Sequence, residues 1–600
     1  MNNLFFTNSI MVRNMPPSLL MGDPPAWHGE EEAIAKIHRF CHEIYHIPVT
    51  WLVDHRSLLD RRDMLKEFIE KYNDEVSVLE WGISLKETEG SEEYQPWVEM
   101  AGIKRPTKDI CRAAFPFVGF YDMKDEDIDK AIKFFAEDFK RLMGVPMKTF
   151  SNAFADNRTV KAMRKYGVKN LWGFNWNYFC EGINNKGSAP GPFYMSDINH
   201  NAPAPDKTYP IGVHWGAASH LIQYETDKQC RAGGAGHCLN SLELTNRSYG
   251  LDRIDFHKKV IREYAENAKW NPIVHIPLQI EAVWIDEGPI PPIFGEKAVY
   301  PSFNRGNSES YFTELEESMR VGAKGVTISD LCDYMRENVP TDHKYIFFSE
   351  DIAPDLRHKG KDAKWDTFVV YKDQKHQYWF LKDRKFNYIK KYSYDPIVPE
   401  TSDEYPYENE PDVALKSKEM LNPTAGIKVT DSGATYEIND FILSAKDDCK
   451  DYAAIIWQAN MPEYVKDVET GGFVKGYVSV KEKNALILFG DLKQGVNECI
   501  FKASLPKDMV KIVRRELVGS RYEIWIENKG PESEMFWLET QIDPQLSLGA
   551  YWWNGEYNHS LFKYGWNDYN QKEGKFMIRV YYPITFKLRE GLNRLSIEVF

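Results

Sequence analysis

The feature that most constrains the fold is an alternation of short apolar runs with amphipathic helical stretches, from residue 1 to about residue 340. This alternation is typical of repeated β/α units around a parallel sheet. It predicts strands at residues 4–12, 48–53, 76–85, 147–155, 168–176, 211–217, 273–284 and 325–328. It predicts helices at residues 30–44, 62–72, 125–143, 159–166 and 252–268. We therefore expect residues 1–340 to form a (β/α)7–8 barrel.

The remainder of the chain has a different pattern. Residues 341–425 contain paired strand-like runs and then an acidic, proline-bearing stretch, which predicts a connecting segment. From residue 426 to residue 600, short strands alternate with turns rich in Gly, Asn, Asp and Pro, as in a β-sandwich. The predicted fold class is an α/β barrel followed by an all-β accessory domain.

Length and charge restrict the classes of function. A chain of 600 residues is long enough for several hydrophobic cores. Its net charge of -14 disfavours nucleic acid and anionic membranes, because both attract positively charged surfaces. No apolar run approaches the length of about 18 residues that a membrane span needs. The first residues lack a basic segment of the signal-peptide type, so we expect a cytoplasmic protein unless a signal was removed. The oligomeric state stays open.

Aromatic residues are abundant. The chain has 17 Trp, 33 Tyr and 33 Phe. Flat rings with polar edges suit stacking against sugars, which would make a carbohydrate the partner. Large β-sheets also favour aromatic residues and explain the composition equally well.

Catalytic groups of parallel barrels lie at the carboxyl ends of the strands, and one such end carries an unusual carboxylate. Glu281 lies in the apolar run HIPLQIEAVWIDEG. An ionised carboxylate is costly there unless it is partnered or functional. Burial would raise its pKa, as a general acid requires. The alternative is a structural carboxylate bonded to the backbone or to an arginine.

Three further carboxylates are candidates for catalysis. Asp156 follows the fourth strand in SNAFADN and is either an active-site group or a helix N-cap, whereas we assign Asn157 to capping. Glu80 ends the third strand next to Trp81 and is either a site acid beside a stacking ring or a salt-bridged strand end. Asp23, in the loop after the first strand, is a reserve acid or a turn former before two prolines.

Polar and aromatic side chains near the strand ends are expected to bind substrate. They are His28, Trp81, Asn152, Trp172, Trp176, His200, His214 and Trp215. Some of the tryptophans must instead be core residues, because successive side chains of a strand point to opposite faces. The histidines are equally well explained as structural groups with satisfied hydrogen bonds.

Three segments resemble the NodB-like polysaccharide deacetylases and the related β/α-barrel glycoside hydrolases. KIHRFCHEIYHIPVTWLV, residues 36–53, is similar to the first helix and second strand of that superfamily. EVSVLEWG, residues 75–82, occupies the place of its third strand. TFSNAFADNRTVKAMRKYGVKNLW, residues 149–172, is similar to its fourth strand and the helix and strand that follow. The resemblance covers about the first 280 residues.

This chain departs from the deacetylases at their metal ligands. The deacetylase chemistry requires an Asp-Asp pair after the first strand and an HxxxH pair after the third. Here the first strand contains Thr7, Asn8 and Ser9, and the third ends with Glu80 and Trp81. A divalent metal needs several converging ligands, and the eight cysteines include no CxxC pair. The missing ligands therefore favour the metal-free hydrolase relatives over the deacetylases, and we expect no cofactor.

These features favour a glycoside hydrolase that acts through two carboxylates at the barrel mouth. The predicted pair is Glu281 with either Asp156 or Glu80. A metal-dependent deacetylase with a rearranged site is the second hypothesis, and it predicts chelator sensitivity. A non-catalytic carbohydrate-binding protein is the third, and it predicts binding without turnover.

Overall fold

A computed structural model gives the conformation of most of the chain. It describes residues 3–12, 30–84, 95–105, 117–174, 188–216, 253–282, 307–350, 367–382, 387–393, 407–409, 413–416, 425–438, 441–457, 459, 461–533, 536–540, 548–557, 566–570, 575–579 and 587–599. These residues form two compact units, Met1–Asn409 and Glu410–Phe600.

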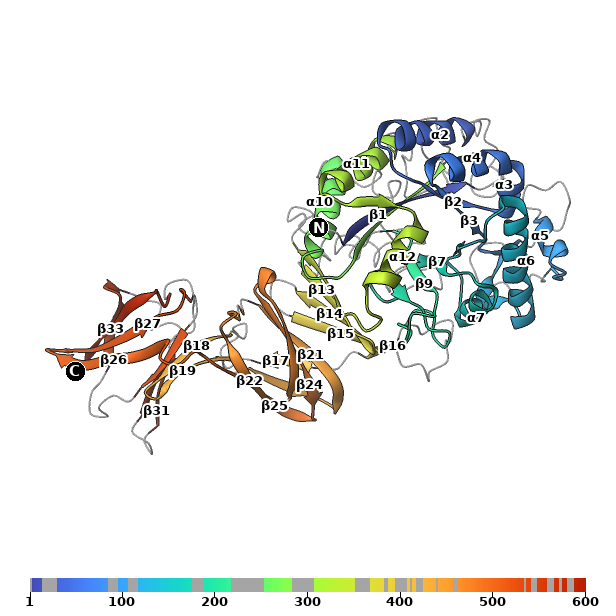
Figure 1. The fold of residues 1–600 in the computed structure, drawn as a ribbon. Helices are drawn as coiled ribbons and strands as arrows, with labels where there is room; N and C mark the ends of the chain where they lie inside the picture. Colours follow the sequence, from blue (N-terminus) through green and yellow to red (C-terminus); the bar gives the residue numbers. More distant parts are fainter. Residues whose placement is uncertain are drawn as a thin grey trace, which may run out of the picture. The chain divides into compact units, whose positions relative to one another are not determined.

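The first unit is built on a curled, mainly parallel sheet, which forms a partial β/α barrel (Figure 1). The strands are, in spatial order, β10 (Val274–Glu281), β1 (Leu4–Val12), β2 (Thr50–Val53), β3 (Glu75–Leu79), β6 (Thr149–Ser151), β7 (Asn170–Phe174), β9 (Ile211–His214) and β8 (Phe193–Tyr194). The short strand β11 (Lys324–Val326) also pairs with β1. Among these strands only β8 runs antiparallel to its neighbour. The predicted fold class is confirmed.

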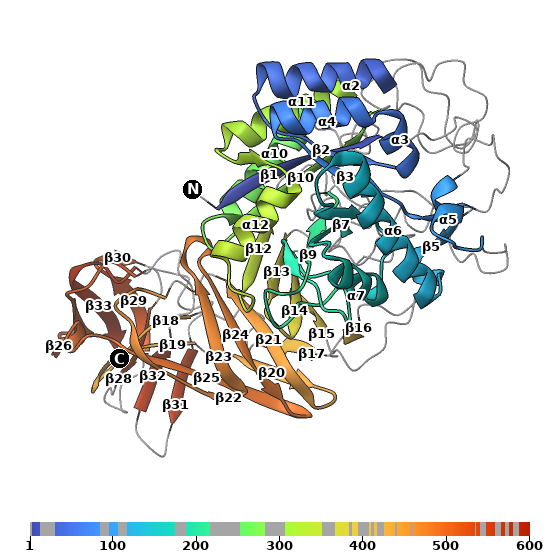
Figure 2. The ribbon, with the colours of Figure 1, turned by 45° about the vertical axis from the view of Figure 1, so that its right-hand side comes forward.

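Helices cover the outside of the curled sheet (Figure 2). They are α2 (Glu30–His38), which continues as a π-helix over Arg39–Ile44, α3 (His55–Asp60), α4 (Arg62–Tyr72), α5 (Pro96–Met100), α6 (Asp125–Met143), α7 (Asn157–Tyr166), α10 (Arg253–Asn267) and α11 (Asn307–Arg320). A further helix, α12 (Ile328–Asn338), instead shares a hydrophobic cluster with Phe5 and Leu52 on the inner face of the sheet. The predicted helices at residues 62–72 and 125–143 coincide with α4 and α6. The sequence analysis did not predict α3, α5, α11 or α12. A two-stranded ribbon, β4 (Gly82–Ser84) and β5 (Phe117–Gly119), follows β3.

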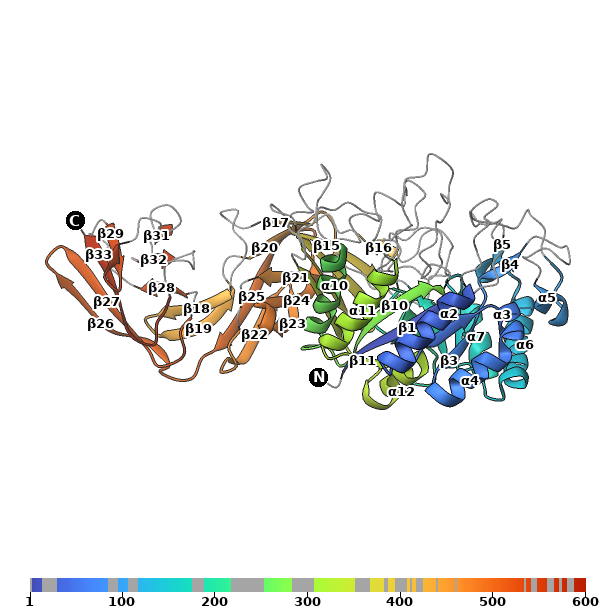
Figure 3. The same ribbon diagram turned by 90° about the horizontal axis from the view of Figure 1, so that it is seen from above.

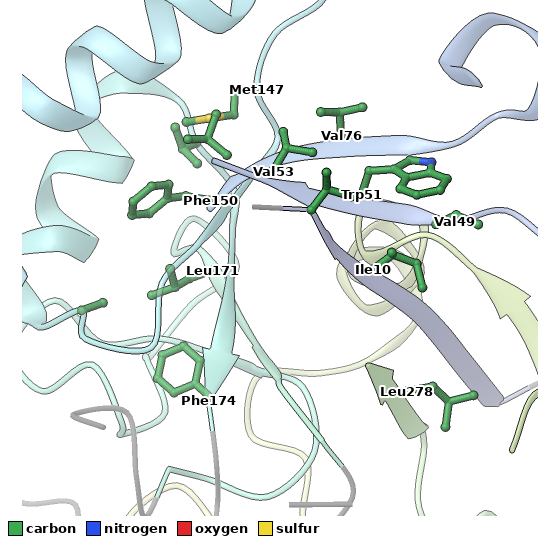
Figure 4. Close-up of a cluster of buried hydrophobic side chains, with 14 of the residues drawn as sticks. Ile10, Val49, Trp51, Val53, Val76, Met147, Phe150, Leu171, Phe174 and Leu278 are labelled. Carbon is green, nitrogen blue, oxygen red and sulfur yellow. The ribbon is translucent and has the colours of Figure 1, made fainter. Parts of the chain in front are cut away.

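The side chains of the sheet form two layers because successive residues of a strand face opposite sides. The outer layer packs beneath the helices and includes Ile10, Trp51, Val76, Phe150 and Leu171 (Figure 4). The inner layer forms a separate cluster inside the curl, with Phe5, Met11, Leu52, Leu79, Trp172 and Val213. The inner layer thus brings Trp172 into the interior of the partial barrel.

Polar contacts attach α12 to the amino ends of the strands. The backbone N–H of Ile328 donates to Thr50 Oγ1 at 3.1 Å, and that of Ser329 donates to Glu75 Oε2 at 2.8 Å. Glu75 also accepts from Thr149 Oγ1 at 2.5 Å. A helix amino terminus has unpaired N–H groups and favours a carboxylate. Burial nevertheless raises the pKa of Glu75. The carboxylate of Glu75 therefore has a structural role at the amino ends of the strands, where it binds the amino end of α12.

An antiparallel sheet completes the first unit. Its strands are, in order, β12 (Tyr345–Glu350), β13 (Thr367–Lys372), β14 (His376–Lys382), β15 (Asn387–Ser393) and β16 (Tyr407–Asn409). Asn267 and Asn271, at the end of α10, exchange hydrogen bonds with the backbone of Phe348 and Ile346. The sheet therefore joins the barrel through α10.

The second unit consists of antiparallel sheets, apart from the parallel pair β18 and β28 (Figure 3). The first sheet contains β17 (Val413–Lys416), β20 (Ile442–Ala445), β25 (Gly495–Ser504), β19 (Gly433–Ile438), β18 (Ala425–Thr430), β28 (Phe536–Thr540), β32 (Lys575–Arg579), β31 (Trp566–Asn570) and β22 (Lys466–Gly472). The second contains β21 (Cys449–Trp457), β24 (Ala485–Leu492) and β23 (Val474–Val480). The third contains β26 (Val510–Val518), β27 (Arg521–Asn528), β33 (Gly591–Val599), β29 (Leu548–Trp553) and β30 (Glu556–Tyr557). Across the described part of both units, no helix has the length and apolarity of a membrane span.

Candidate active site at the carboxyl ends of the barrel strands

Three tryptophans from different parts of the sequence meet at the carboxyl ends of the strands. Trp81 follows β3, Trp172 lies in β7 and Trp215 follows β9. The ring centroids of Trp81 and Trp215 lie 6.3 Å apart, and those of Trp215 and Trp172 lie 5.9 Å apart. Phe154 contacts Trp81 at 5.9 Å. Trp81 and Trp215 are only partly buried. We call Trp81, Trp172 and Trp215 the tryptophan wall.

A glutamine of β10 holds the wall in place. The indole N–H of Trp215 donates to Gln279 Oε1 at 2.9 Å. Gln279 pairs with Ser9 of β1 in the parallel register and is 2% exposed. The sequence analysis did not select Gln279. The sequence does contain a feature that could have identified it, because Gln279 is a polar residue within the same apolar run from which Glu281 was selected.

Glu80 and Asn152 are joined beside the wall. Asn152 Nδ2 donates to the backbone oxygen of Glu80 at 2.5 Å, and Asn152 Oδ1 accepts from the backbone N–H of Phe154 at 2.5 Å. The backbone N–H of Glu80 donates to Ser151 O. Asn152 therefore fixes the ends of β3 and β6 relative to each other, and both its side-chain groups are used within the protein.

The carboxyl group of Glu80 is buried and its pKa is strongly raised. It accepts from the backbone N–H of His55 at 3.1 Å and from Gln95 Nε2 at 2.9 Å. Only 4% of the residue is exposed. Desolvation raises the pKa of Glu80 to about 8, with a further contribution from the negative charge of Asp54. Glu80 is therefore largely protonated at neutral pH, because an acid holds its proton below its pKa.

His55, next to this carboxyl group, is a residue that the sequence analysis did not select. His55 Nε2 lies 3.0 Å from Asp138 Oδ2, and both side chains are buried. Asp54 caps α3 by accepting from the backbone N–H of Ser57 at 2.6 Å. The dipeptide Asp54-His55 directly after an apolar strand was the signal in the sequence. These contacts fix the amino end of α3, which supplies the backbone donor to Glu80.

Asp156 caps a helix. Its Oδ1 accepts from the backbone N–H groups of Arg158 at 2.9 Å and Thr159 at 3.1 Å, and the Thr159 side chain completes a capping box. Its Oδ2 accepts from Arg158 Nε at 2.6 Å. The cap was assigned to Asn157, and the structure corrects this assignment, because Asn157 is the first residue of α7 and Asp156 precedes it. The carboxylate of Asp156 is thus occupied at the amino end of α7.

This cap gives a prediction about stability. Asp156→Ala removes both backbone contacts and the pair with Arg158, so it should lower the free energy of unfolding by about 1–2 kcal/mol. Asp156→Asn retains an acceptor oxygen and should cost less than about 1 kcal/mol. Thermal unfolding of the two variants measures the difference. Equal melting temperatures for both variants and the parent would contradict the capping role.

The two predicted substrate histidines that the structure describes are buried among protein groups. His214 Nε2 lies 3.1 Å from the backbone oxygen of Ala189 and 3.3 Å from Ser188 Oγ. Burial lowers the pKa of His214 to about 4. His200 is fully buried, and its ring lies 5.7 Å from that of Phe174, in the outer layer. Both histidines therefore contact protein groups, Ala189 and Ser188 for His214 and Phe174 for His200.

Other predicted residues lie partly or wholly outside the described structure. Asp23 and His28 fall in residues 13–29, and Trp176 falls in residues 175–187. The backbone of Glu281 is the last position of β10, opposite Met11 of β1. Its side chain lies outside the described residues. Within the described part of the chain, no group of three or more His, Cys, Asp or Glu side chains has the arrangement of a metal site.

Comparisons with known proteins concern the fold. No protein-family model matches this sequence, and no curated protein matches it. The structure is similar to polysaccharide deacetylases and glycoside hydrolases. This similarity is one of fold alone.

Three solved structures illustrate the similarity. A glycoside hydrolase/deacetylase candidate from Parabacteroides distasonis is 15% identical, covers 68% of this chain and 89% of its own, and has a TM-score of 0.41. A polysaccharide deacetylase candidate from Mycobacterium smegmatis is 9% identical, with coverages of 56% and 91% and a TM-score of 0.31. The 4-alpha-glucanotransferase of Thermococcus litoralis is 7% identical, with coverages of 100% and 98% and a TM-score of 0.26. We base the function proposed below on the residues of this chain.

Gly173 provides a second test of the site's construction. Its φ is +124°, and a Cβ atom would lie 2.6 Å from the backbone oxygen of Asn152. Gly173→Ala should therefore destabilise the protein by about 2 kcal/mol or more, through backbone strain and displacement of Asn152. Gly144→Ala is the matched control, because Gly144 has φ +78° but open space around it, and should cost about 1 kcal/mol. Thermal unfolding should show the larger loss for Gly173→Ala, and the reverse order would contradict the steric argument.

Proposed function

We propose that the protein is a glycoside hydrolase whose saccharide substrate binds against the tryptophan wall. The observation that carries this proposal is a carboxyl group with a pKa of about 8, Glu80, directly before Trp81 of the wall. Hydrolysis of a glycosidic bond needs an acid that is still protonated at the working pH. Glu80 is the described carboxyl group at the barrel mouth that meets this requirement.

The partly exposed rings of the wall supply the surface for substrate recognition. Trp81 and Trp215 would stack on the apolar faces of a sugar ring, because both are only partly buried. Trp172 is fully buried in the inner layer and supports Trp215 through a ring contact at 5.9 Å. Stacking on aromatic rings with polar edges favours a saccharide over a purely apolar ligand.

The proposed reaction uses two glutamates in separate roles. Glu80 donates its proton to the glycosidic oxygen as the bond from that oxygen to the anomeric carbon breaks. Glu281 is the second carboxylate, which attacks the anomeric carbon or removes a proton from the attacking water. The position of Glu281 at the carboxyl end of β10, two residues after Gln279, supports this assignment. Asp156, which caps α7, has no role in this proposal.

A substrate screen tests the proposal. The full chain is incubated with aryl glycosides and natural oligosaccharides, with and without EDTA, and both released sugar and released acetate are measured. We expect hydrolysis of a glycoside that persists in EDTA. In Trp215→Ala, KM for that substrate should rise at least about tenfold through the loss of stacking, whereas Tyr209→Ala, which removes a ring outside the wall, is the control. Acetate release that EDTA abolishes would replace the proposal with a deacetylase, and binding without turnover would replace it with a binding protein.

A further inference from the structure

The third sheet of the second unit has one apolar face and one open face. Ile524 and Ile526 of β27 and Leu595 and Ile597 of β33 are buried on the apolar face. The alternate positions of the same strands lie on the opposite face. We call this opposite face the arginine–tryptophan face and define it by Arg514, Arg521, Trp525, Trp552, Tyr557 and Arg594. Figure 3 shows β26, β27 and β33 side by side in this sheet.

Guanidinium groups stand over the tryptophan rings of this face. Arg514 Cζ lies 4.8 Å from the ring centroid of Trp525, and Arg594 Cζ lies 5.6 Å from it. Arg521 Cζ lies 4.0 Å from the ring centroid of Trp552. The Trp552 ring also contacts that of Tyr557, at 5.6 Å. Cation–π contacts of this kind restrict the rotamers of both partners.

Carboxylates hold two of the arginines in fixed positions. Arg594 donates through Nε and Nη2 to the two oxygens of Glu523, at 2.6 and 2.8 Å. Glu523 is 1% exposed and also accepts from Ser596 Oγ at 2.8 Å. Arg514 pairs with Glu516, two residues further along the same strand, β26. Side chains that are already ordered lose little entropy when a ligand binds.

The same face exposes apolar and aromatic surface. Tyr557 is 49% exposed, Leu592 is 63% exposed and Val518 is 53% exposed. Leu592 pairs with Glu527, and Val518 with Arg521, so both lie on the same side of the sheet as Trp525. Apolar groups gathered with ordered polar groups on one sheet face are typical of a binding surface.

We propose that the arginine–tryptophan face binds a neutral polysaccharide. The face carries four cationic groups, from Lys511, Arg514, Arg521 and Arg594, and four carboxylates, from Glu516, Glu523, Glu527 and Glu598. The charges cancel, and a polyanion such as nucleic acid or an acidic glycan needs an excess of positive charge. A neutral sugar chain requires no such excess.

The chemistry of the face matches the two kinds of surface that a neutral sugar presents. Its C–H groups can lie against the exposed ring of Tyr557 and the open part of Trp552. Its hydroxyl groups can bond to the ordered guanidinium and carboxylate groups, because bonds to charged groups are stronger than those between neutral groups. This inference does not depend on the hydrolase proposal, because it concerns residues of the other unit.

Affinity electrophoresis of the full chain tests the inference. The gels contain soluble starch, hydroxyethyl cellulose or arabinoxylan as neutral polymers, and polygalacturonate as the anionic comparison. The variants are Tyr557→Ala and Trp552→Ala. The matched control is Val496→Ala, which removes a residue that is 72% exposed on β25 of another sheet. Because Tyr557 is the more exposed ring, its variant keeps the test valid if Trp552→Ala fails to fold.

We expect at least one neutral polymer to retard the parent protein. Its Kd should rise about tenfold in Tyr557→Ala and stay unchanged in Val496→Ala. Tighter binding of polygalacturonate, no retardation by any neutral polymer, or unchanged binding in Tyr557→Ala would overturn the inference. Light scattering of the same samples measures the oligomeric state. A dimer that Tyr557→Ala dissociates, together with no binding of any polymer, would also overturn the inference.

Hydrolysis of small aryl glycosides by these variants separates the two proposals. The rates should be the same in Tyr557→Ala, Val496→Ala and the parent. Polymer binding without hydrolysis would remove the hydrolase proposal alone. Hydrolysis without polymer binding would remove the present inference alone.

Discussion

Glu281→Gln should lower kcat for glycoside hydrolysis by about 10²–10⁴-fold, the loss expected when an acid, base or nucleophile is replaced by an isosteric amide. Glutamine has nearly the same size as glutamate, so the substitution should leave the pairing of residue 281 with Met11 unchanged. It cannot carry the negative charge that the second carboxylate of a glycosidase needs. Steady-state kinetics on the best aryl glycoside from the screen measure this loss.

Gln279→Ala is the matched control on the same strand. Gln279 holds Trp215 through a 2.9 Å hydrogen bond, so its removal should loosen the wall and act mainly on KM. A variant Glu281→Gln that retains more than half of the parental kcat would remove Glu281 from the reaction. The same loss of kcat in Gln279→Ala would indicate a general disturbance of β10 instead.

The barrel could be predicted from the sequence because its strands are short, apolar and separated by clear helical patterns. Residues 4–12 form β1 over the full predicted range, and residues 62–72 and 125–143 form α4 and α6. Their hydrophobic periodicity depends only on residues close together in the sequence, so it can be recognised without a structure. The attachment of α12 could not be predicted, because it depends on Thr50 and Glu75, which lie more than 250 residues away along the chain.

The candidate site could be predicted only in part, for a similar reason. Trp81, Trp172 and Trp215 were selected because each lies at a strand end, and the curl of the sheet brings their rings together. The sequence did not separate Asp156, a cap, from Glu80, a buried acid. Both are acidic residues near strand ends, and their difference lies in the partners, Arg158 for one and the backbone of His55 for the other.

Glu80 should make the stability of the first unit depend on pH. Its pKa is raised from 4.5 to about 8 in the folded protein. The folded state therefore binds the proton more tightly than the unfolded state, so this stabilisation is fully present below pH 4.5 and is lost as the pH rises to about 8. At 1.36 kcal/mol for each pKa unit, the loss is of the order of 3–5 kcal/mol.

Glu80→Gln should remove that loss, because an amide does not ionise. Urea unfolding of the parent and the variant is measured at pH 5, 6.5 and 8. Between pH 5 and pH 8, the free energy of unfolding should fall more in the parent than in Glu80→Gln. Glu99→Gln, on the neighbouring helix α5, is the control, because the Glu99 side chain is 48% exposed. Parallel pH curves for the parent and Glu80→Gln would show that Glu80 does not hold a proton between pH 5 and 8.

The same variant tests the acid role through the leaving group. A glycoside with a nitrophenolate leaving group needs little protonation, whereas a sugar alkoxide needs a full proton from the acid. Glu80→Gln should therefore keep most of its activity on nitrophenyl glycosides and lose about 10²–10⁴-fold on natural oligosaccharides. The parent should lose activity on the oligosaccharides as the pH rises past about 8, where Glu80 ionises. An equal loss on both substrates would make Glu80 a positioning residue, because a group that only supports the wall affects both leaving groups alike.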